Sequence, residues 1–303
     1  MVSSEKIWSG SGLIVLDKPR GPSSHQVAAW VGTMLGCQTG HSGTLDPQVS
    51  GVLLVMLGNA ARLAPLLLKH DKEYVCLMRL RGDATREQVD SILKEFTGRI
   101  YQRPPKRSAV KRNLRIRTVL SSELLSYDGR LVLFRMRCDA GTYVRSLCHH
   151  IGLALGVGAQ MQELRRTRSG PFEECQAYSL WDLADACMKA REGDPEALKK
   201  MILPVDKVVP DLPKVIIRDT AIDALCHGAR LAGVGVCRCD PFRKGDMVAV
   251  LSPAGEFVCL GKGLSSTAEF RPGEPGIVVA PVAVFMKPGT YRKGWKKGKG
   301  CKG

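Results

Sequence analysis

The stretch TGHSGTLDPQVSGVLLVML, which begins at Thr39, holds a single carboxylate, Asp46, in a turn that runs into an apolar segment. No second acid lies within the stretch, so it offers no local carboxylate pair for acid–base catalysis. Asp-Pro commonly initiates turns, which favours a structural role. However, Gly43 and Gly51 permit close backbone approach, and Pro47 keeps Asp46 out of helical geometry. The sequence therefore predicts a carboxylate on a shaped loop at a strand entrance, a common place for a functional residue.

The stretch GTYVR, which begins at Gly141, contains an arginine whose position needs an explanation. If Thr142 caps a helix, Arg145 lies in its first turn, where a cation opposes the helix dipole. A partner anion would offset that cost. Asp46 is one candidate, because an arginine neighbour keeps a carboxylate ionised and oriented. Asp139 or a bound phosphate explains the arginine equally well from spacing alone.

Tyr74 follows three charged residues at the expected start of a strand. An aromatic residue there usually fills the core or an edge, but in a basic protein it can also stack on a nucleobase. His41, Ser42 and Asp46 do not predict a hydrolase triad, since no G-x-S-x-G motif accompanies them. The sequence also lacks a phosphate-binding loop and a dinucleotide fingerprint, so we expect no nucleotide cofactor.

The charge of the chain points to a polyanionic partner. Among 303 residues, 45 lysines and arginines face 29 acids, a formal net charge of +16. Nucleic acid is the leading candidate. A membrane is less favoured, because the longest clean apolar run, Val52 to Leu57, has the length of a strand, and the N-terminus does not resemble a signal peptide. The 11 cysteines contain no C-x-x-C pair, which predicts reduced thiols and no metal site.

Periodicity predicts the elements that must position these residues. The turn at Gly21 to Ser24 is suited to cap a helix. The expected elements are a strand at Gly12–Leu16, a helix with its apolar face at Val27, Trp30, Val31, Met34 and Leu35, strands at Val52–Leu57 and Tyr74–Leu80, a helix carrying Val89, Ile92, Leu93 and Phe96 that Gly98 ends, a strand at Leu131–Arg137, a helix with its apolar face at Val144, Leu147, Cys148, Ile151 and Leu155, and helical segments between Ser179 and Met201. Strands and helices interleave without a regular βαβ period. We therefore predict an α+β fold with a mixed or antiparallel sheet.

The composition changes near residues 203–213, where three prolines lie close together. This is a plausible domain boundary. The following residues, 214–287, show short β-rich runs separated by glycine and proline, which is typical of a small β-barrel. The tail KPGTYRKGWKKGKGCKG suits an RNA contact, a nuclear signal or a solvated end equally well.

Six stretches in one order resemble the TruB-type pseudouridine synthases, and most closely the dyskerin branch, the catalytic subunit of H/ACA ribonucleoproteins. They are LDKPRGPSSHQV, TGHSGTLDPQVSGVL, KEYV, RPPKRSAVKRNLRIRTV, CDAGTYVRSLCHHIG and GAQMQELRRTRSGPF. The resemblance covers residues 12–287. It implies a TruB-type pseudouridine synthase catalytic domain at residues 1–211, a PUA RNA-binding domain at 212–287 and a basic Gly/Lys-rich tail at 288–303.

The resemblance also implies roles for single residues. Asp46 would be the catalytic aspartate that acts on a flipped-out uridine, Arg145 its ion-pair partner, and Tyr74 the aromatic residue stacked on the base. The substrate-binding residues would be Tyr143 and Leu164 in the pocket wall, His41 beside the substrate loop, and Lys18 supporting the Asp46 loop. No cofactor is implied.

Basic residues are expected to line an RNA groove, although a solvated face is the alternative. The candidates are Arg103, Lys106, Arg107, Lys111, Arg112, Arg165 and Arg166.

The resemblance implies an RNA-guided enzyme that isomerises uridine to pseudouridine in rRNA and other RNAs. Its partners would be an H/ACA guide RNA, a target RNA (rRNA, snRNA or tRNA) and three small proteins: a zinc-ribbon-like one, a glycine/arginine-rich one and a kink-turn binder. The YRKGWKKG tail resembles the eukaryotic subgroup, which predicts the nucleus and nucleolus, or the cytoplasm if the source is not eukaryotic. Two alternatives stay open, a stand-alone tRNA pseudouridine synthase and a non-catalytic RNA-binding scaffold.

Overall fold

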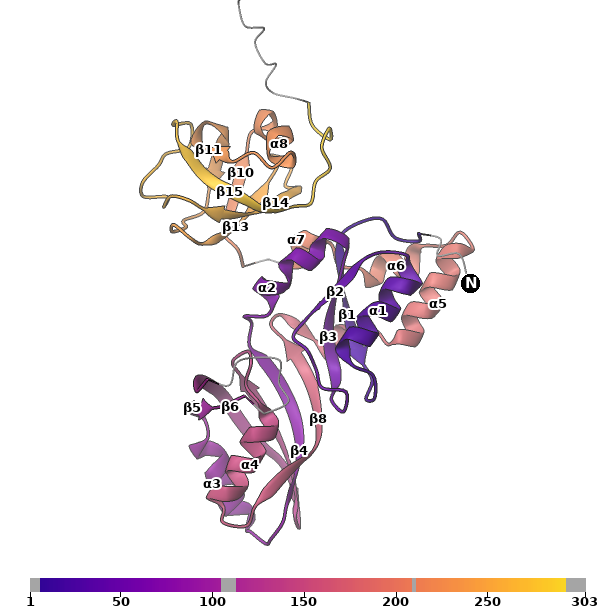
Figure 1. The fold of residues 1–303 in the computed structure, drawn as a ribbon, viewed down its shortest axis with the longest axis vertical. Helices are drawn as coiled ribbons and strands as arrows, with labels where there is room; N and C mark the ends of the chain where they lie inside the picture. Colours follow the sequence, from indigo (N-terminus) through magenta and orange to yellow (C-terminus); the bar gives the residue numbers. More distant parts are fainter. Residues whose placement is uncertain (1–5, 105–112, 209–210, 293–303) are drawn as a thin grey trace, which may run out of the picture. The chain divides into compact units, whose positions relative to one another are not determined.

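The computed structural model describes residues 6–104, 113–208 and 211–292 (Figure 1). The chain forms two compact units. The first consists mainly of residues 14–57 and 63–202, and the second of residues 10–13, 58–62 and those from 203 onward. The residues of the candidate site all belong to the first unit.

A mixed sheet forms the frame of the first unit. Its strands are β1 Gly12–Lys18, β2 Thr39–Ser42, β3 Ser50–Leu57, β4 Lys72–Leu80, β5 Gly98–Gln102, β6 Arg115–Asp128, β7 Leu131–Cys138, β8 Ala159–Ser169 and β9 Phe172–Glu173. The main order is β1-β3-β8-β4-β7-β6-β5, with β2 beside β3 and β9 beside β8. β3 and β8 run parallel, whereas β4 is antiparallel to both β7 and β8. The α+β prediction with a mixed sheet is confirmed.

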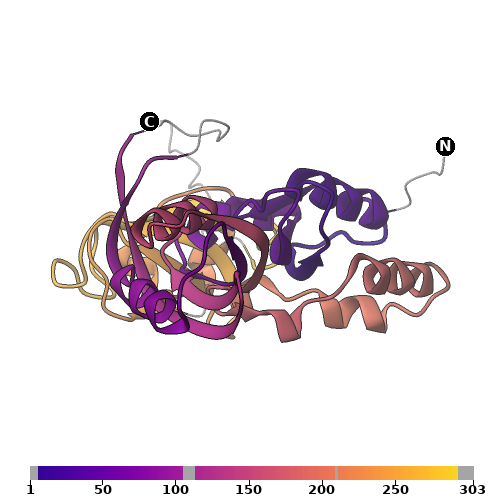
Figure 2. The same cartoon turned by 90° about the horizontal axis from the view of Figure 1, so that it is seen from below.

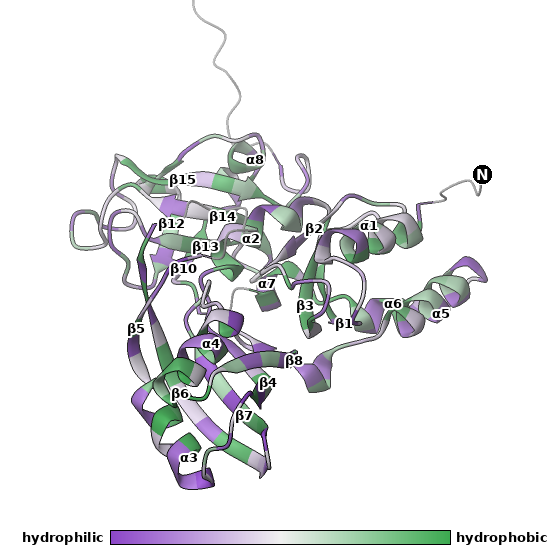
Figure 3. Ribbon diagram, turned by 60° about the horizontal axis from the view of Figure 1, so that its bottom comes forward, coloured by the Kyte–Doolittle hydropathy of each residue, from purple (hydrophilic) through white to green (hydrophobic). Residues whose placement is uncertain are grey.

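Helices cover two parts of this sheet. They are α1 Ser24–Leu35, α2 Ala64–Leu67, α3 Arg86–Glu95, α4 Val144–Ala154, α5 Leu180–Arg191 and α6 Glu196–Met201, with 3-10 turns at Gly58–Leu63 and Glu174–Gln176. α1, α5 and α6 share one core with β1 and β3, and α1 packs beside α5 (Figure 2). α3 and α4 share a second core with β4 and β7. Hydrophobic residues follow β3 along its length, as expected for a strand buried on both faces (Figure 3).

One helix end follows the expected local chemistry, while Gly98 and Trp30 depart from the expected pattern. Ser23 caps α1 through the backbone N–H of Gln26, as the turn sequence predicted. Gly98 does not end the preceding helix: α3 stops at Glu95, and Gly98 opens β5 with φ of 111°. Trp30 was expected on the buried face of α1 but is 46% exposed.

The second unit is a small barrel-like sheet. Its elements are α7 Val205–Val208, β10 Lys214–Ile217, α8 Asp219–Cys226, β11 Leu231–Ala232, a 3-10 turn at Gly233–Gly235, β12 Val236–Cys239, β13 Met247–Leu251, β14 Phe257–Gly263 and β15 Ile277–Val284. The strand order is β11-β15-β14-β13-β10-β12, a nearly closed six-stranded sheet. Its interior is aliphatic, and α8 contributes to it. The β-barrel prediction is confirmed. Across the described residues, no helix combines the length and apolarity that crossing a membrane requires.

Candidate active site

Asp46 lies on the loop that joins β2 to β3. Its carbonyl oxygen accepts a hydrogen bond from the N–H of Val49 at 3.0 Å, which closes a turn around Pro47. Just before it, the buried hydroxyl of Ser24 accepts from the N–H of Leu45 at 2.8 Å and donates to its carbonyl at 3.0 Å. The backbone on both sides of Asp46 is therefore fixed, while the carboxylate itself is exposed.

Asp46 forms an ion pair with Arg145, the second residue of α4. Spacing alone left the anionic partner of Arg145 open, and the structure shows that this partner is Asp46. Asp139 instead accepts from the backbone N–H of Thr118 at 2.8 Å. Both charged side chains remain more than half exposed, at 56% for Arg145 and 57% for Asp46. The carboxylate is therefore oriented by the arginine and still accessible to a ligand.

The start of α4, which carries Arg145, is capped differently from the prediction. Thr142 was expected to cap the helix, but its hydroxyl donates to the carbonyl of Asp139 at 2.8 Å. Tyr143 occupies the cap position without a side-chain cap. The buried amide of Gln102 holds the backbone of Tyr143 instead, accepting from its N–H at 2.9 Å and donating to its carbonyl at 3.2 Å. Gln102 was missed because it comes from β5, far along the chain.

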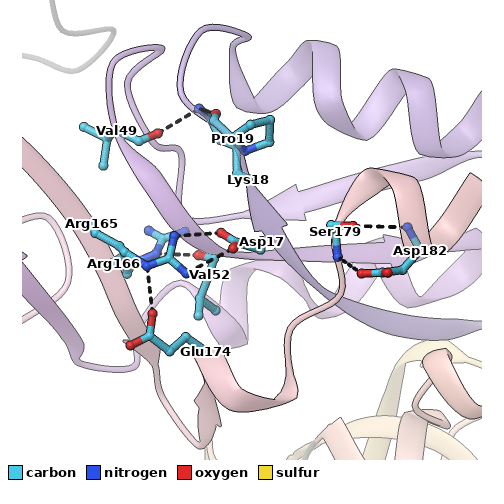
Figure 4. A network of polar contacts seen from close by, with 10 residues as sticks. All are labelled: Asp17, Lys18, Pro19, Val49, Val52, Arg165, Arg166, Glu174, Ser179 and Asp182. Atoms are coloured by element: carbon cyan, nitrogen blue, oxygen red, sulfur yellow. Dashed lines mark hydrogen bonds and ion pairs between the residues drawn. The ribbon is translucent and has the colours of Figure 1, made fainter.

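Lys18 supports the Asp46 loop through its backbone, and Figure 4 shows its ammonium beside the carbonyls of Pro19 and Val49. Its side chain is fully buried, and its ammonium donates to the carbonyls of Pro19 and Val49 at 2.8 Å and of Pro47 at 3.4 Å. Burial lowers the pKa of Lys18, the nearby charge of Arg166 lowers it further, and Asp46 opposes both. The predicted support of the loop is confirmed. Because the ammonium faces backbone carbonyls, a direct contact between Lys18 and a substrate is not indicated.

Arg166 is 1% exposed and joins the two ends of the same loop. Its Nη2 donates to the carbonyl of Gly43 at 2.8 Å, and its Nε donates to the carbonyl of Val52 at 2.7 Å. Its place among the RNA-groove residues was therefore wrong. Arg165 and Arg166 are neighbours on β8, and neighbours on a strand point to opposite faces, so both could not line one groove.

Arg165 takes the outer position and is held by two acids (Figure 4). It makes two hydrogen bonds to Asp17 at 3.0 Å each and one to Glu174 at 2.8 Å. These carboxylates occupy its guanidinium, so the structure gives no support for its predicted RNA contact. Arg103 is exposed. The four other predicted groove residues, Lys106, Arg107, Lys111 and Arg112, lie outside the described residues.

Tyr74 is half-buried on β4, where it is the cross-strand partner of Arg166. Burial raises the pKa of the Tyr74 hydroxyl, and the charge of Arg166 and a hydrogen bond from it oppose that rise. The charge of Asp46 also acts on this hydroxyl. Tyr74 therefore lies within the electrostatic reach of both Asp46 and Arg166.

Lys72 is a buried cation that the sequence reasoning did not single out. Its ammonium donates to three carbonyls at and after the C-terminal end of α2, those of Leu67 at 3.2 Å, Leu68 at 3.4 Å and His70 at 2.6 Å. Burial lowers its pKa to about 8, with a further contribution from Arg166. A signal existed, because Lys72 occupies an inward position of the alternating pattern that Tyr74 continues.

The remaining predicted substrate residues have distinct surroundings. His41 Nε2 lies 3.4 Å from the hydroxyl of Thr44, and burial lowers its pKa together with the charges of His25 and Arg166. Tyr143 and Leu164 are half-buried, and Leu164 packs against the core shared by α4 and β4. Contact between these three residues and a substrate stays a prediction.

An apolar pocket of about 610 Å³ explains the exposure of Trp30. Trp30 lines it together with Met34, Leu180 and Trp181, while Lys18 forms part of the wall. Asp46 is not among its lining residues. The pocket is therefore separate from the accessible carboxylate.

The arrangement suits chemistry by one carboxylate. A preorganised loop presents Asp46 to solvent, Arg145 orients it, and buried cations fix the backbone on either side. Such an acid can act as a nucleophile or a general base toward a ligand that lies over it.

Three protein-family models match this chain. The TruB family pseudouridylate synthase (N terminal domain) model matches residues 33–144, the tRNA pseudouridylate synthase B C-terminal domain model matches residues 145–210, and the PUA domain model matches residues 213–285.

Relatives and solved structures support the same family. A "Probable tRNA pseudouridine synthase B" of Methanosarcina barkeri is 48% identical over 289 residues, which cover 94% of this chain and 86% of that protein. The "Structure of H/ACA RNP bound to a substrate RNA containing 2'-deoxyuridine" matches with 47% identity and a TM-score of 0.84, covering 94% of this chain and 88% of that one. The "Crystal Structure of a Cbf5-Nop10-Gar1 Complex" matches with 49% identity and a TM-score of 0.84, covering 91% and 85%. The chain therefore belongs to the TruB family of pseudouridine synthases and carries a C-terminal PUA domain.

Proposed function

We propose that this pseudouridine synthase is RNA-guided and isomerises uridine in rRNA and other RNAs as part of an H/ACA ribonucleoprotein. The observation that carries the proposal is the close match, over more than nine-tenths of the chain, to a protein solved within an H/ACA complex with substrate RNA. The net charge of +16 supports a partner that is RNA.

In the proposed reaction the target uridine is flipped out of its RNA and lies over Asp46. Asp46 attacks the nucleoside or otherwise assists cleavage of the C1′–N1 bond. The uracil stays bound, turns, and rejoins the ribose through C5, while C5 loses a proton and N1 gains one. Nothing is hydrolysed, so the site must exclude water and retain the free base.

Other residues have supporting roles in this proposal. Arg145 keeps the carboxylate of Asp46 aimed, as the ion pair supports. Tyr74 stacks on the flipped base, with Tyr143 and Leu164 beside it and His41 near the substrate strand. Arg103 supplies a positive charge to the RNA backbone, which its exposure supports.

The proposed partners are a guide RNA, a target RNA and small accessory proteins. Two proteins, Nop10 and Gar1, are named in a matching complex, which supports accessory protein partners. Their zinc-ribbon-like and glycine/arginine-rich character rests on the family resemblance. The kink-turn binder rests on the family resemblance.

A stand-alone tRNA pseudouridine synthase is the second candidate. The name "Probable tRNA pseudouridine synthase B" of the curated relative favours it. This enzyme would need neither a guide RNA nor accessory proteins.

Sequencing the RNA that copurifies with the chain from its own cells separates the two candidates. The guided enzyme should enrich hairpin-hinge-hairpin RNAs that end in ACA. Purified protein should then modify an rRNA oligonucleotide only when a complementary guide and the accessory proteins are added. Enrichment of tRNA alone, with modification of a bare tRNA transcript, would replace the guided proposal by the second candidate.

A nuclear and nucleolar location is also proposed, on the resemblance of the tail alone. The curated relative is archaeal, and residues 293–303 lie outside the described residues. Imaging of the full chain and of a chain lacking the tail tests this location.

A further inference from the structure

The buried guanidinium of Arg166 is the least expected feature of the candidate site. Moving a charged group out of water costs several kcal/mol, so cores seldom keep one without a partner of opposite charge. Arg166 donates hydrogen bonds to two backbone carbonyls, those of Gly43 and Val52. A hydrophobic side chain of similar volume would serve stability at least as well.

The two carbonyls mark the ends of the loop that carries Asp46. Gly43 lies three residues before Asp46, and Val52 lies six residues after it, inside β3. A guanidinium is planar and its donors keep a fixed spacing, so two bonds from one arginine fix the separation of their acceptors. A lysine in its place has one nitrogen, so it would have to reach both carbonyls from a single point instead of from the two nitrogens that now bond to them.

The loop ends are pressed against Arg166 so closely that glycine is required. A Cβ at Gly43 would lie 3.1 Å from Nη1 of Arg166, and one at Gly51 would lie 2.2 Å from the Arg166 carbonyl oxygen. Both glycines adopt positive φ, 74° and 101°. The backbone therefore fits closely against the side chain of Arg166 at Gly43 and against its main chain at Gly51.

Arg166 also connects the loop to Tyr74. The two residues are cross-strand partners on β4 and β8, and the charge of Arg166 acts on the tyrosine hydroxyl. Arg166 thus bonds to the loop that presents the carboxylate and lies opposite the residue proposed to stack on the base. Lys18 holds the middle of the loop through Pro47 and Val49.

We propose that Arg166 is a positioning residue for the isomerisation, which fixes the Asp46 loop relative to Tyr74 without touching the RNA. This inference rests on the proposed roles of Asp46 and Tyr74. It requires that loss of the paired hydrogen bonds slow the chemical step and leave RNA affinity nearly unchanged.

The test compares Arg166→Lys and Arg166→Met with wild type and with Arg135→Met. Arg135 is an exposed arginine of the same sheet that pairs with Glu123, so its replacement controls for loss of a charge. Each protein is assembled with the RNA that wild type modifies, either a guide-paired rRNA oligonucleotide or a tRNA transcript. Single-turnover rate, RNA Kd and thermal melting are measured.

We expect Arg166→Lys to slow the single-turnover rate by about 30-fold or more, while the RNA Kd changes by less than about threefold. Arg166→Met should lose at least as much rate, and Arg135→Met should stay within about twofold of wild type. A folded Arg166→Lys with a rate within about threefold of wild type would overturn the proposal.

Two other outcomes would also overturn it. A Kd that rises as much as the rate falls would make Arg166 an RNA-binding residue. Failure of both Arg166 variants to fold at any temperature would make its role one of stability alone. Asp46→Asn is included to separate failure of the positioning role from failure of the proposed function. If wild type is active and Asp46→Asn is inactive, normal rates in the Arg166 variants contradict only the positioning role. If wild type modifies neither RNA, the proposed function fails instead.

Discussion

Asp46 and Arg145 lie 99 residues apart in the chain and meet as an ion pair. Both side chains are more than half exposed, and exposed ion pairs contribute only about 0–1 kcal/mol to stability. Stability alone therefore does not explain an arginine in the first turn of α4, where it opposes the helix dipole. Orientation of the Asp46 carboxylate explains the position of this arginine.

Replacing Arg145 by methionine should separate activity from stability. The free energy of unfolding should change by less than about 1 kcal/mol, because the pair is exposed. The rate of pseudouridine formation should fall by about 100-fold, because the carboxylate loses its orienting charge. Denaturant melts and single-turnover assays measure both quantities. A stability loss of several kcal/mol with an unchanged rate would contradict an orienting role.

Tyr74 offers a test of which part of its side chain matters. Tyr74→Phe keeps the ring and removes only the hydroxyl, so the rate should fall by about tenfold at most. Tyr74→Leu removes the aromatic face, and stacking is worth about 1–3 kcal/mol per base, so its rate should fall further. Equal losses in the two variants would place the function of Tyr74 in the hydroxyl alone.

Gly51 should be far less replaceable than Gly98. Both have φ near +100°, at 101° and 111°, so an alanine is strained at either position. At Gly51 the added Cβ would overlap the backbone of Arg166, whereas at Gly98 it meets nothing within 4 Å. Gly98→Ala should cost about 1–2 kcal/mol and Gly51→Ala clearly more, with loss of activity. Equal melting temperatures would contradict the close contact.

Lys72 should make stability depend on pH. Its folded pKa of about 8 lies below the ordinary 10.5, so between these values the unfolded chain binds more protons. Stability relative to Lys72→Met should therefore rise by up to about 3 kcal/mol as pH increases from 8 to 10.5, and be lost as pH falls through 8. Urea titrations of both proteins across this range measure it. A constant difference, or one that falls with pH, would contradict the depressed pKa.

The sequence predicted the site where its signals were local. The Asp-Pro turn between glycines indicated a shaped loop, and the helix dipole indicated that Arg145 needs an anion. The identity of that anion could not be read from spacing, because it depends on how α4 packs against β4 and β8. The family resemblance supplied the choice that the ion pair then confirmed.

Predictions that depended on side-chain direction were less successful. A run of basic residues suggested a groove, yet Arg166 points inward and Arg165 is held by Asp17 and Glu174. Composition counts charges but does not say which face of a strand each occupies. Thr142 is not the cap, because its hydroxyl bonds to the carbonyl of Asp139 and the helix begins one residue later. The Gln102 amide that holds Tyr143 comes from a distant strand, so spacing could not indicate it.

The measurement that tests the central claim most directly is the activity and RNA affinity of Asp46→Asn beside wild type. The substitution keeps the size of the side chain and the hydrogen bonds of the loop backbone, and it removes the negative charge. We predict no detectable pseudouridine in the RNA that wild type modifies, with an RNA Kd within about threefold of wild type. Pseudouridine formation by a homogeneous Asp46→Asn protein at a rate within about tenfold of wild type would show that the catalytic group lies elsewhere.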